Sequence, residues 1–203
     1  MPGEALEIPA SGYDAVIFDC DGTLVDSMPM HYDAWEYALA KSGFAHPFTH
    51  QRHYGNAGMP IPATVAQLNA EFGTNLDADR INADRAVYLR KHHPTAGPVL
   101  PVVDFAGSLA GKLPMAVASG SDREIVDDSL AHLGIAHLFP VVVTPEDVAP
   151  GRGKPAPDMF LLAAERMDVD PARCLVFEDG HNGILAAQAA GMQTVFVPTP
   201  APT

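Results

Sequence analysis

The sequence predicts an α/β fold in which a parallel sheet is interrupted by an all-helical insertion. A short apolar run at residues 15–18 has the composition of a buried strand and lacks the period of an amphipathic helix. From residue 102 onwards, short apolar runs alternate with amphipathic segments, which is typical of parallel sheets with helical crossovers. Between these two regions, residues 28–96 show helical periodicity without any strand signal.

The first predicted strand, residues 15–18, is followed at its carboxyl end by two acidic residues. A strand that is apolar on both faces belongs in the centre of a sheet, and ligands of open α/β sheets bind beyond the carboxyl ends of strands. Asp19 and Asp21 lie there, and Gly22 allows a sharp turn. Carboxylates at such a turn can gather a hard cation, although Asp-Gly is also a common pair in ordinary turns.

The insertion begins with a helix that opens at Met28-Pro29 and ends at Gly43, since proline is tolerated in the first helical turn. A loop rich in His, Gly and Pro is expected over 44–62. Two further helical patterns follow at 63–72 and 77–91.

The rest of the core is predicted as four strands that alternate with four helices. The strands are expected at 115–118, 141–143, 174–177 and 194–197, and the helices at 102–111, 122–133, 157–167 and 183–190. This pattern predicts a core built from residues 1–27 and 97–203 and a helical cap of residues 28–96.

The composition restricts the partners of the chain. Its 203 residues include 12 Lys and Arg against 25 Asp and Glu, a formal net charge of −13 at pH 7. Such a balance, without a basic run, argues against nucleic acid or an anionic membrane as partner. No apolar stretch approaches the roughly 20 residues that span a bilayer. No long apolar face is left unexplained, so we expect a monomer, and the partner that we expect is a small molecule.

Two cysteines, Cys20 and Cys174, form neither a disulfide framework nor a zinc pattern. They are interpreted as small core residues of a protein in a reducing compartment. The first twelve residues lack the basic and apolar regions of a signal peptide, so the sequence favours a cytoplasmic location.

The second strand is followed by a candidate phosphate cradle. Ser119 offers a hydroxyl, and Gly120 leaves backbone N–H groups open ahead of the next helix. We interpret both as substrate-binding residues. Ser121 and Asp122 are interpreted as caps of that helix.

Two later loops add charged groups at the same sheet edge. Lys154 lies between a glycine and a proline just before a helix, although a loop lysine is more often a solvated charge. Glu178 and Asp179 follow the strand 174–177, where acids could also serve only as helix caps. Oxygen ligands from two segments suit magnesium, and Asp19 with the Asp179 carboxylate would supply them.

Three strings carry a family resemblance: DCDGTLVDS at 19–27, GKPAPDMF at 153–160 and VFEDGHNG at 176–183. Together with the serine after the second strand, they resemble the four ordered motifs of the haloacid dehalogenase superfamily of phosphotransferases. The resemblance implies a Rossmann-like parallel sheet core with an inserted all-helical cap. In the fourth motif this chain has Gly180 and His181 where the family more often has Ser or Ala.

The resemblance also implies roles. Asp19 attacks phosphorus, Asp21 handles the proton, and Lys154 offsets negative charge, while Thr23 of the first motif contacts substrate. Mg²⁺ is the implied cofactor. Its implied ligands are the carboxylates of Asp19 and Asp179 and the backbone carbonyl of Asp21. Glu178 is implied as a supporting residue.

The cap start MHYDAW, residues 30–35, resembles the β-phosphoglucomutase-like branch. His31 is assigned to contact Asp21 or the substrate, and Arg85 to face the site, although a solvated helix charge is an equal alternative for Arg85. The remaining cap histidines are interpreted as loop or surface residues: His46, His50, His53, His92 and His93.

Within that branch the chain most resembles sugar-phosphate phosphatases of the fructose-1-phosphate type, which predicts a magnesium-dependent phosphatase. A phosphomutase is the alternative. It would need a cation for a second phosphate, and residues 55–65 contain none, although Arg52 or Arg85 could substitute. A phospho-accepting signalling module is disfavoured because it would lack a helical insertion of about seventy residues after the first strand.

Overall fold

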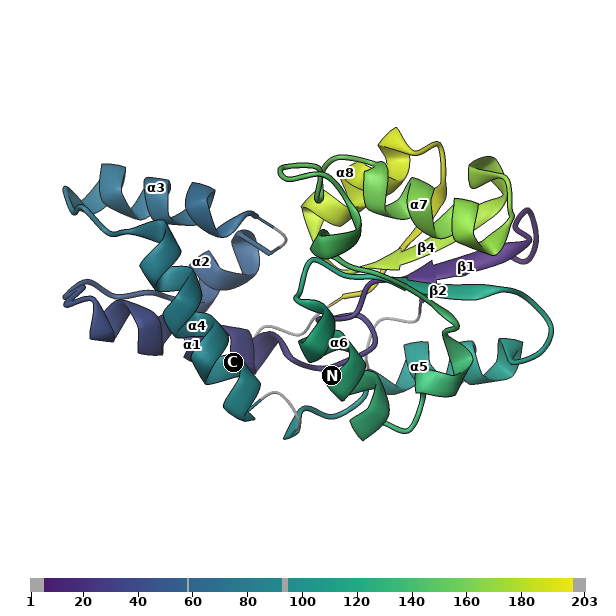
Figure 1. The fold of residues 1–203 in the computed structure, drawn as a ribbon, viewed down its shortest axis with the longest axis horizontal. Coiled ribbons are helices and arrows are strands. Elements are labelled where there is room, and N and C mark those ends of the chain that lie inside the picture. The colour runs from purple at the N-terminus through teal and green to yellow at the C-terminus, as the bar shows by residue number, and fades with distance from the viewer. Residues whose placement is uncertain (1–5, 58, 93–94, 199–203) are drawn as a thin grey trace.

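A computed structural model describes residues 6–57, 59–92 and 95–198. Figure 1 shows two parts, a sheet with helices on both faces and a group of helices beside it. Among the described residues, no helix is long and apolar enough to span a membrane. Cys20 and Cys174 are buried and free, as predicted.

The sheet has five parallel strands in the order β3-β2-β1-β4-β5. At its centre lies β1 (Ala15–Phe18), between β2 (Met115–Ala118) and β4 (Cys174–Glu178). The outer strands are β3 (Val141–Val143) and β5 (Gln193–Phe196). Because all strands run the same way, their carboxyl ends meet at one edge, and the predicted α/β fold is confirmed.

Helices cover both faces of the sheet (Figure 1). On one face lie α5 (Leu100–Leu109) and α6 (Arg123–His132), and on the other α7 (Asp158–Met167) and α8 (His181–Ala189). Short 3₁₀ turns complete the connections, at Ala136–Leu138, Pro145–Asp147 and Pro171–Arg173.

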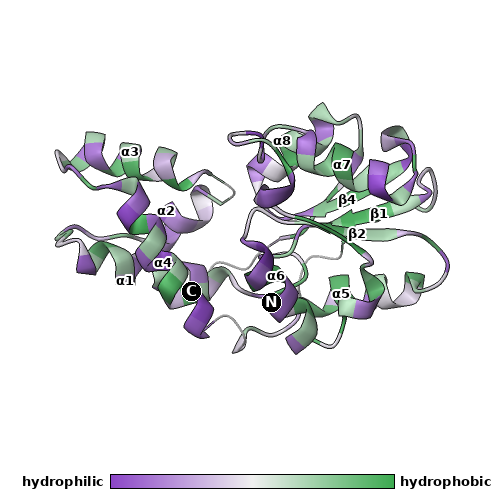
Figure 2. Cartoon of the chain, in the orientation of Figure 1, coloured by the Kyte–Doolittle hydropathy of each residue, from purple (hydrophilic) through white to green (hydrophobic). Residues whose placement is uncertain are grey.

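Alternate side chains of the central strand β1 pack into the hydrophobic clusters on the two faces of the sheet. Val16 and Phe18 pack with residues of α5 and α6, whereas Ala15 and Ile17 pack with residues of α7 and α8. The four side chains are fully buried, which explains the continuous apolar run in the sequence. Figure 2 shows β1 in green along its length.

The insertion consists of α1 (Met28–Lys41), α2 (His50–Gly55), α3 (Ile61–Phe72) and α4 (Ala78–His92). It has a small core of its own, built from residues of these helices and the loop before α2: Trp35, Ala38, Leu39, Phe48, Val65, Leu68 and Ile81. The helices therefore stabilise one another without the sheet. Its division from the core at residues 27 and 97 stays a proposal.

Two adjacent chain segments connect the insertion to the sheet. Asp26 N–H donates to the Gly97 carbonyl at 2.8 Å, and Val99 N–H donates to the Leu24 carbonyl at 2.9 Å. The insertion thus leaves and rejoins the core at one point, as a cap on a double hinge would.

The structure corrects one prediction about the insertion. The stretch 44–62, predicted as a loop, contains α2, whose N-cap Thr49 accepts a hydrogen bond from the Arg52 N–H at 3.2 Å. A six-residue helix is too short to show a hydrophobic period, so the sequence pattern could not reveal it. His93 lies outside the described residues.

Candidate active site

A cavity of about 460 Å³ lies between the carboxyl edge of the sheet and the insertion. The sheet side contributes the loops after β1, β2 and β4 and the loop before α7, and the insertion contributes α1 to α4. Residues far apart in the chain therefore line one cavity that is open to solvent, as expected at the switch point of a parallel sheet.

Asp19 and Lys154 form a buried ion pair in this cavity. Lys154 Nζ lies 2.5 Å from Asp19 Oδ1 and 3.3 Å from Glu178 Oε2. Burial opposes the charge of the ammonium group, but the two carboxylates outweigh it and raise the pKa of Lys154. The lysine is therefore a fixed cation beside the first carboxylate after β1.

Burial raises the pKa of both acids beside Lys154. Desolvation raises the pKa of Asp19, and the nearby ammonium group partly offsets that rise. Desolvation followed by repulsion from Asp19 raises the pKa of Glu178 well above its usual range. Crowded buried carboxylates of this kind are costly unless a further cation joins them.

Asp19, Glu178 and Asp179 form an oxygen cluster in which the candidate ligand atoms all lie within 4.8 Å of one another. Two glycines make room for it. A Cβ on Gly22, whose φ is +80°, would lie 2.2 Å from Asp179 Oδ2, and a Cβ on Gly183 would lie 1.6 Å from Glu178 Oε1. The donor set and the space reserved for it fit a hard divalent cation.

The carboxylate of Asp21 faces other partners. It accepts hydrogen bonds from Ser27 Oγ at 2.7 Å and from Ser121 Oγ at 2.6 Å, and His31 Nε2 lies 3.1 Å away. The predicted contact of His31 with Asp21 is thus present. Sequence reasoning missed both serines, and Ser121 was expected to cap α6, whereas its hydroxyl instead binds Asp21.

Arg85 is buried and lies behind His31. One of its terminal nitrogens is 3.4 Å from His31 Nδ1, and its guanidinium group lies 4.6 Å over the Trp35 ring. Because arginine can only donate, this contact assigns Nδ1 as acceptor and places a ring proton on Nε2, the nitrogen 3.1 Å from Asp21 Oδ1. Burial lowers the pKa of Arg85 to about 10, so it stays charged at neutral pH.

The three predicted substrate contacts of the core have different positions. Ser119 is almost fully buried, and its Oγ accepts a hydrogen bond from the Ser121 N–H at 3.1 Å. Ser119 and Gly120 both line the cavity. Thr23 is fully buried and is not among the lining residues, so the structure does not bring its side chain to the cavity.

His53 corrects another sequence interpretation. It was assigned to the surface, but it is only 6% exposed on α2, lines the cavity, and lies with Nε2 3.0 Å from the Met28 carbonyl. Burial lowers its pKa to about 4, so the ring is neutral. His46 and His50 are exposed, as predicted.

Comparisons with known proteins agree with this arrangement. The haloacid dehalogenase-like hydrolase family matches residues 13–191. This chain belongs to that family. It is 39% identical to fructose-1-phosphate phosphatase YqaB of Escherichia coli over 188 residues, which are 91% of this chain and 96% of that protein.

Two further relatives of this hydrolase cover most of both chains. The phosphorylated carbohydrates phosphatase of Thermotoga maritima is 28% identical over 90% of this chain and 84% of its own. A crystal structure of a haloacid dehalogenase-like protein of unknown function from Agrobacterium tumefaciens superposes with a TM-score of 0.76, at 30% identity over 90% of this chain and 82% of its own. Together with the family match, the named phosphatases support a phosphomonoester hydrolase.

Proposed function

We propose that this hydrolase is a metal-dependent phosphatase that removes the phosphoryl group of a small sugar phosphate through an aspartyl-phosphate. The observation that carries the proposal is the position of two carboxylates with separate environments in one cavity. Asp19 is paired with a buried ammonium group, whereas Asp21 accepts from two serine hydroxyls and lies beside the imidazole of His31. One can act as nucleophile and the other as acid and base.

Asp19, Glu178 and Asp179 would hold the metal ion, with the backbone carbonyl of Asp21 as a further ligand, and Mg²⁺ is the ion we propose. When bound, it would neutralise negative charge on the phosphoryl oxygens and on the crowded acids. The oxygen cluster and the space that Gly22 and Gly183 leave for it support this assignment.

In the first step, an Asp19 oxygen attacks phosphorus and the bond to the sugar oxygen breaks. A proton on the Asp21 carboxyl passes to that leaving oxygen, which departs as the alcohol. Lys154 stabilises the negative charge that the attacking and transferring groups share. Ser119 and Gly120 hold the remaining phosphoryl oxygens.

In the second step, Asp21 is a carboxylate and accepts a proton from water. The water oxygen bonds to phosphorus, the bond to Asp19 breaks, and inorganic phosphate is released with both acids restored. His31, held by Arg85 in the Nε2–H form, lies 3.1 Å from Asp21 and keeps its carboxylate oriented between the two steps.

The insertion wall of the cavity supports a sugar as the alcohol part. It combines apolar surfaces with a few polar groups, from these residues: Trp35, Phe48, Asn56, Ile61, Asn82, Arg85 and Leu89. Apolar walls suit the carbon face of a sugar, and amides and a guanidinium group suit its hydroxyls. The names of the E. coli and T. maritima phosphatases point to the same class.

The cavity favours hydrolysis over transfer to a second hydroxyl. Arg52 is engaged with Glu71 at 2.7 Å and does not line the cavity, and Arg85 lies beside His31 and so near Asp21. The described part of 55–65 contributes no cation. Among the described residues that line the cavity, the only Lys or Arg are thus Lys154 and Arg85, and neither lies where it would hold a second phosphate far from the reacting one.

The test is a panel of phosphorylated metabolites, including β-glucose 1-phosphate, assayed for inorganic phosphate with Mg²⁺ and with a strong chelator. We expect phosphate release from sugar monophosphates, loss of activity with chelator, and recovery when Mg²⁺ is restored. Full activity in chelator would overturn the metal proposal. Glucose 6-phosphate that accumulates faster than phosphate would overturn hydrolysis in favour of a mutase.

A further inference from the structure

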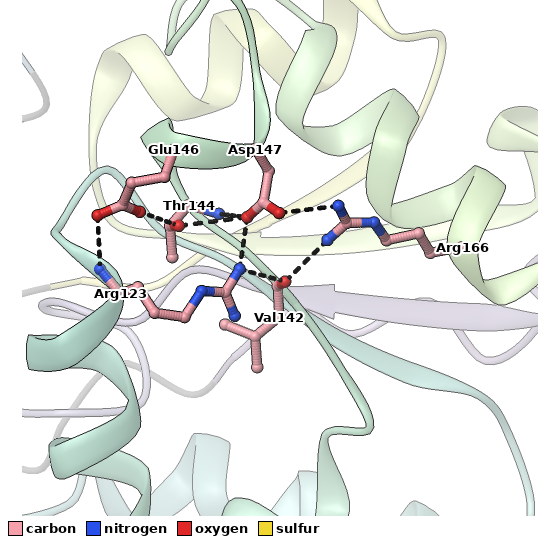
Figure 3. Close-up of polar contacts among 6 residues, drawn as sticks. All are labelled: Arg123, Val142, Thr144, Glu146, Asp147 and Arg166. Atoms are coloured by element: carbon pink, nitrogen blue, oxygen red, sulfur yellow. Dashed lines mark hydrogen bonds and ion pairs between the residues drawn. The ribbon is translucent and has the colours of Figure 1, made fainter.

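A charged cluster lies behind the loop that carries Ser121, outside the catalytic scheme. Figure 3 shows the Asp147 carboxylate between two guanidinium groups. Arg123 donates to Asp147 Oδ2 at 2.5 Å, and Arg166 donates to Asp147 Oδ1 at 2.8 Å. Both arginines also donate to the Val142 carbonyl, at 3.0 and 3.2 Å. Their side chains are 37% and 38% exposed, so they form a closely matched pair.

Only one of these arginines belongs to the catalytic loop. Arg123 is the first residue of α6 and follows Ser121 by two positions, whereas Arg166 lies in the last turn of α7. The Arg123 N–H donates to Glu146 Oε1 at 3.2 Å (Figure 3). Asp122, at the N-cap position of α6, makes no capping bond with its side chain. The turn after β3 therefore provides the cap that the sequence predicted from Ser121 or Asp122.

The turn after β3, which accepts the hydrogen bonds of Arg123, is held by hydrogen bonds of its own. Thr144 is fully buried, its N–H donates to Asp147 Oδ2 at 2.9 Å, and its hydroxyl donates to Glu146 Oε2. Burial opposes ionisation of Asp147, but bonds from Arg166 and Thr144 and the charge of Arg123 lower its pKa to about 2. The Thr144 hydroxyl lowers the pKa of Glu146. Both acids are therefore charged throughout the neutral range.

We propose that Arg123 is a positioning residue that fixes the loop 119–122 against the turn after β3, so that the Ser121 hydroxyl reaches Asp21. This inference rests on the proposed function, in which Asp21 is the acid and base. The Ser121 Oγ to Asp21 Oδ2 distance is 2.6 Å. A shift of the loop by about 1 Å would break that bond, and misplacements of this size can cost large factors in rate.

Arg123→Ala and Arg166→Ala test the proposal as a matched pair, because each removes contacts to the same two acceptors. With a sugar phosphate as substrate, we expect Arg123→Ala to lower kcat about 10-fold with a smaller change in KM. Arg166→Ala should stay within about 2-fold of wild type in kcat. Thermal unfolding should show similar losses of stability for both.

The same substitution in a Ser121→Ala background tests whether Arg123 acts through Ser121. If Arg123 acts through Ser121, Arg123→Ala should have little further effect on kcat in that background. Equal kcat losses in the two arginine variants, or an undiminished Arg123→Ala effect in the Ser121→Ala background, would overturn the proposal.

Amide hydrogen exchange supplies a readout that does not depend on turnover. In the substrate-free enzyme, exchange in the segment 119–122 should be faster in Arg123→Ala than in wild type and unchanged in Arg166→Ala. Unchanged exchange in Arg123→Ala, or equal acceleration in both variants, would overturn the positioning role. If wild type released no phosphate from the panel, the proposed function would fail while this measurement still decided the role of Arg123.

Discussion

Two buried cations line the same cavity, and they differ in what surrounds them. Lys154, on the sheet side, has two carboxylates within 3.3 Å, and its charge is balanced by the protein itself. Arg85, on the insertion side, meets a histidine ring and the face of Trp35, and its Nε has no hydrogen-bond partner among the described residues. A buried donor without a partner is costly, so it is retained where a ligand can satisfy it.

This difference suggests separate roles for the two sides of the cavity: the sheet edge for the reaction and the insertion for the choice of substrate. The sheet edge holds its charged groups in a fixed arrangement before any ligand arrives, as phosphoryl transfer requires. The insertion presents unused hydrogen-bonding capacity on an apolar wall, as recognition of a varied alcohol requires. Substitutions at the sheet edge should therefore lower the rate for all substrates alike. Substitutions in the insertion should lower it by amounts that depend on the substrate.

The largest effect is expected at the sheet edge, from Asp19→Asn. The amide cannot attack phosphorus, so kcat should fall by at least about 10³-fold for every substrate in the panel. Steady-state phosphate release measures this, and thermal unfolding verifies that the variant is folded. Retention of more than a small fraction of the wild-type rate would remove Asp19 from the role of nucleophile.

A smaller and selective effect is expected from Arg85→Ala. Loss of a charged donor to the sugar and of support for His31 should lower kcat/KM for a sugar phosphate roughly 10- to 100-fold. An aryl phosphate without sugar hydroxyls should lose less. Arg52→Ala is the control, because Arg52 pairs with Glu71 outside the cavity and should leave kcat/KM nearly unchanged. Equal losses for both substrates would contradict a role of Arg85 in selection.

The smallest effect concerns stability and comes from His53. Its pKa falls from an ordinary 6.5 to about 4 on folding. A depressed folded pKa means that stability is complete above about pH 6.5 and declines as the pH drops toward 4, because the unfolded ring takes up a proton first. Between pH 7 and pH 5, wild type should lose about 2 kcal/mol of unfolding free energy that His53→Gln does not lose.

Urea unfolding at several pH values measures this difference. Gln is a suitable replacement because its amide can still donate to the Met28 carbonyl. Parallel pH profiles for wild type and variant would show that His53 is not buried in its neutral form.

The sequence was most informative where chain neighbours decide the structure. The apolar run 15–18 and the glycine after Asp21 predicted a central strand with acids at its end, and the structure confirms that fold. The strand ends also predicted that Asp19, Ser119 and Lys154 would share one edge, and they do line one cavity. Their roles in the reaction stay predictions.

The rest depends on contacts that form only on folding. Ser27 approaches Asp21 because the chain doubles back after Gly22, whose N–H donates to the Val25 carbonyl at 2.8 Å. Ser121 was expected to cap α6 because it lies next to the start of that helix. In the structure, the carboxylate of Glu146, in the turn after β3, accepts the hydrogen bond of the Arg123 N–H instead. His53 lies on a helix too short to show a period. None of these contacts leaves a pattern in the chain.

The central claim is that the phosphoryl group is transferred twice, first to Asp19 and then to water. Each in-line displacement inverts the configuration at phosphorus, so the two steps together restore it. The most direct measurement is the stereochemical course with a sugar phosphorothioate made chiral at phosphorus by two oxygen isotopes and hydrolysed in water enriched in the third. Transfer through Asp19 predicts inorganic thiophosphate with net retention of configuration; net inversion, which a single attack by water produces, would contradict it.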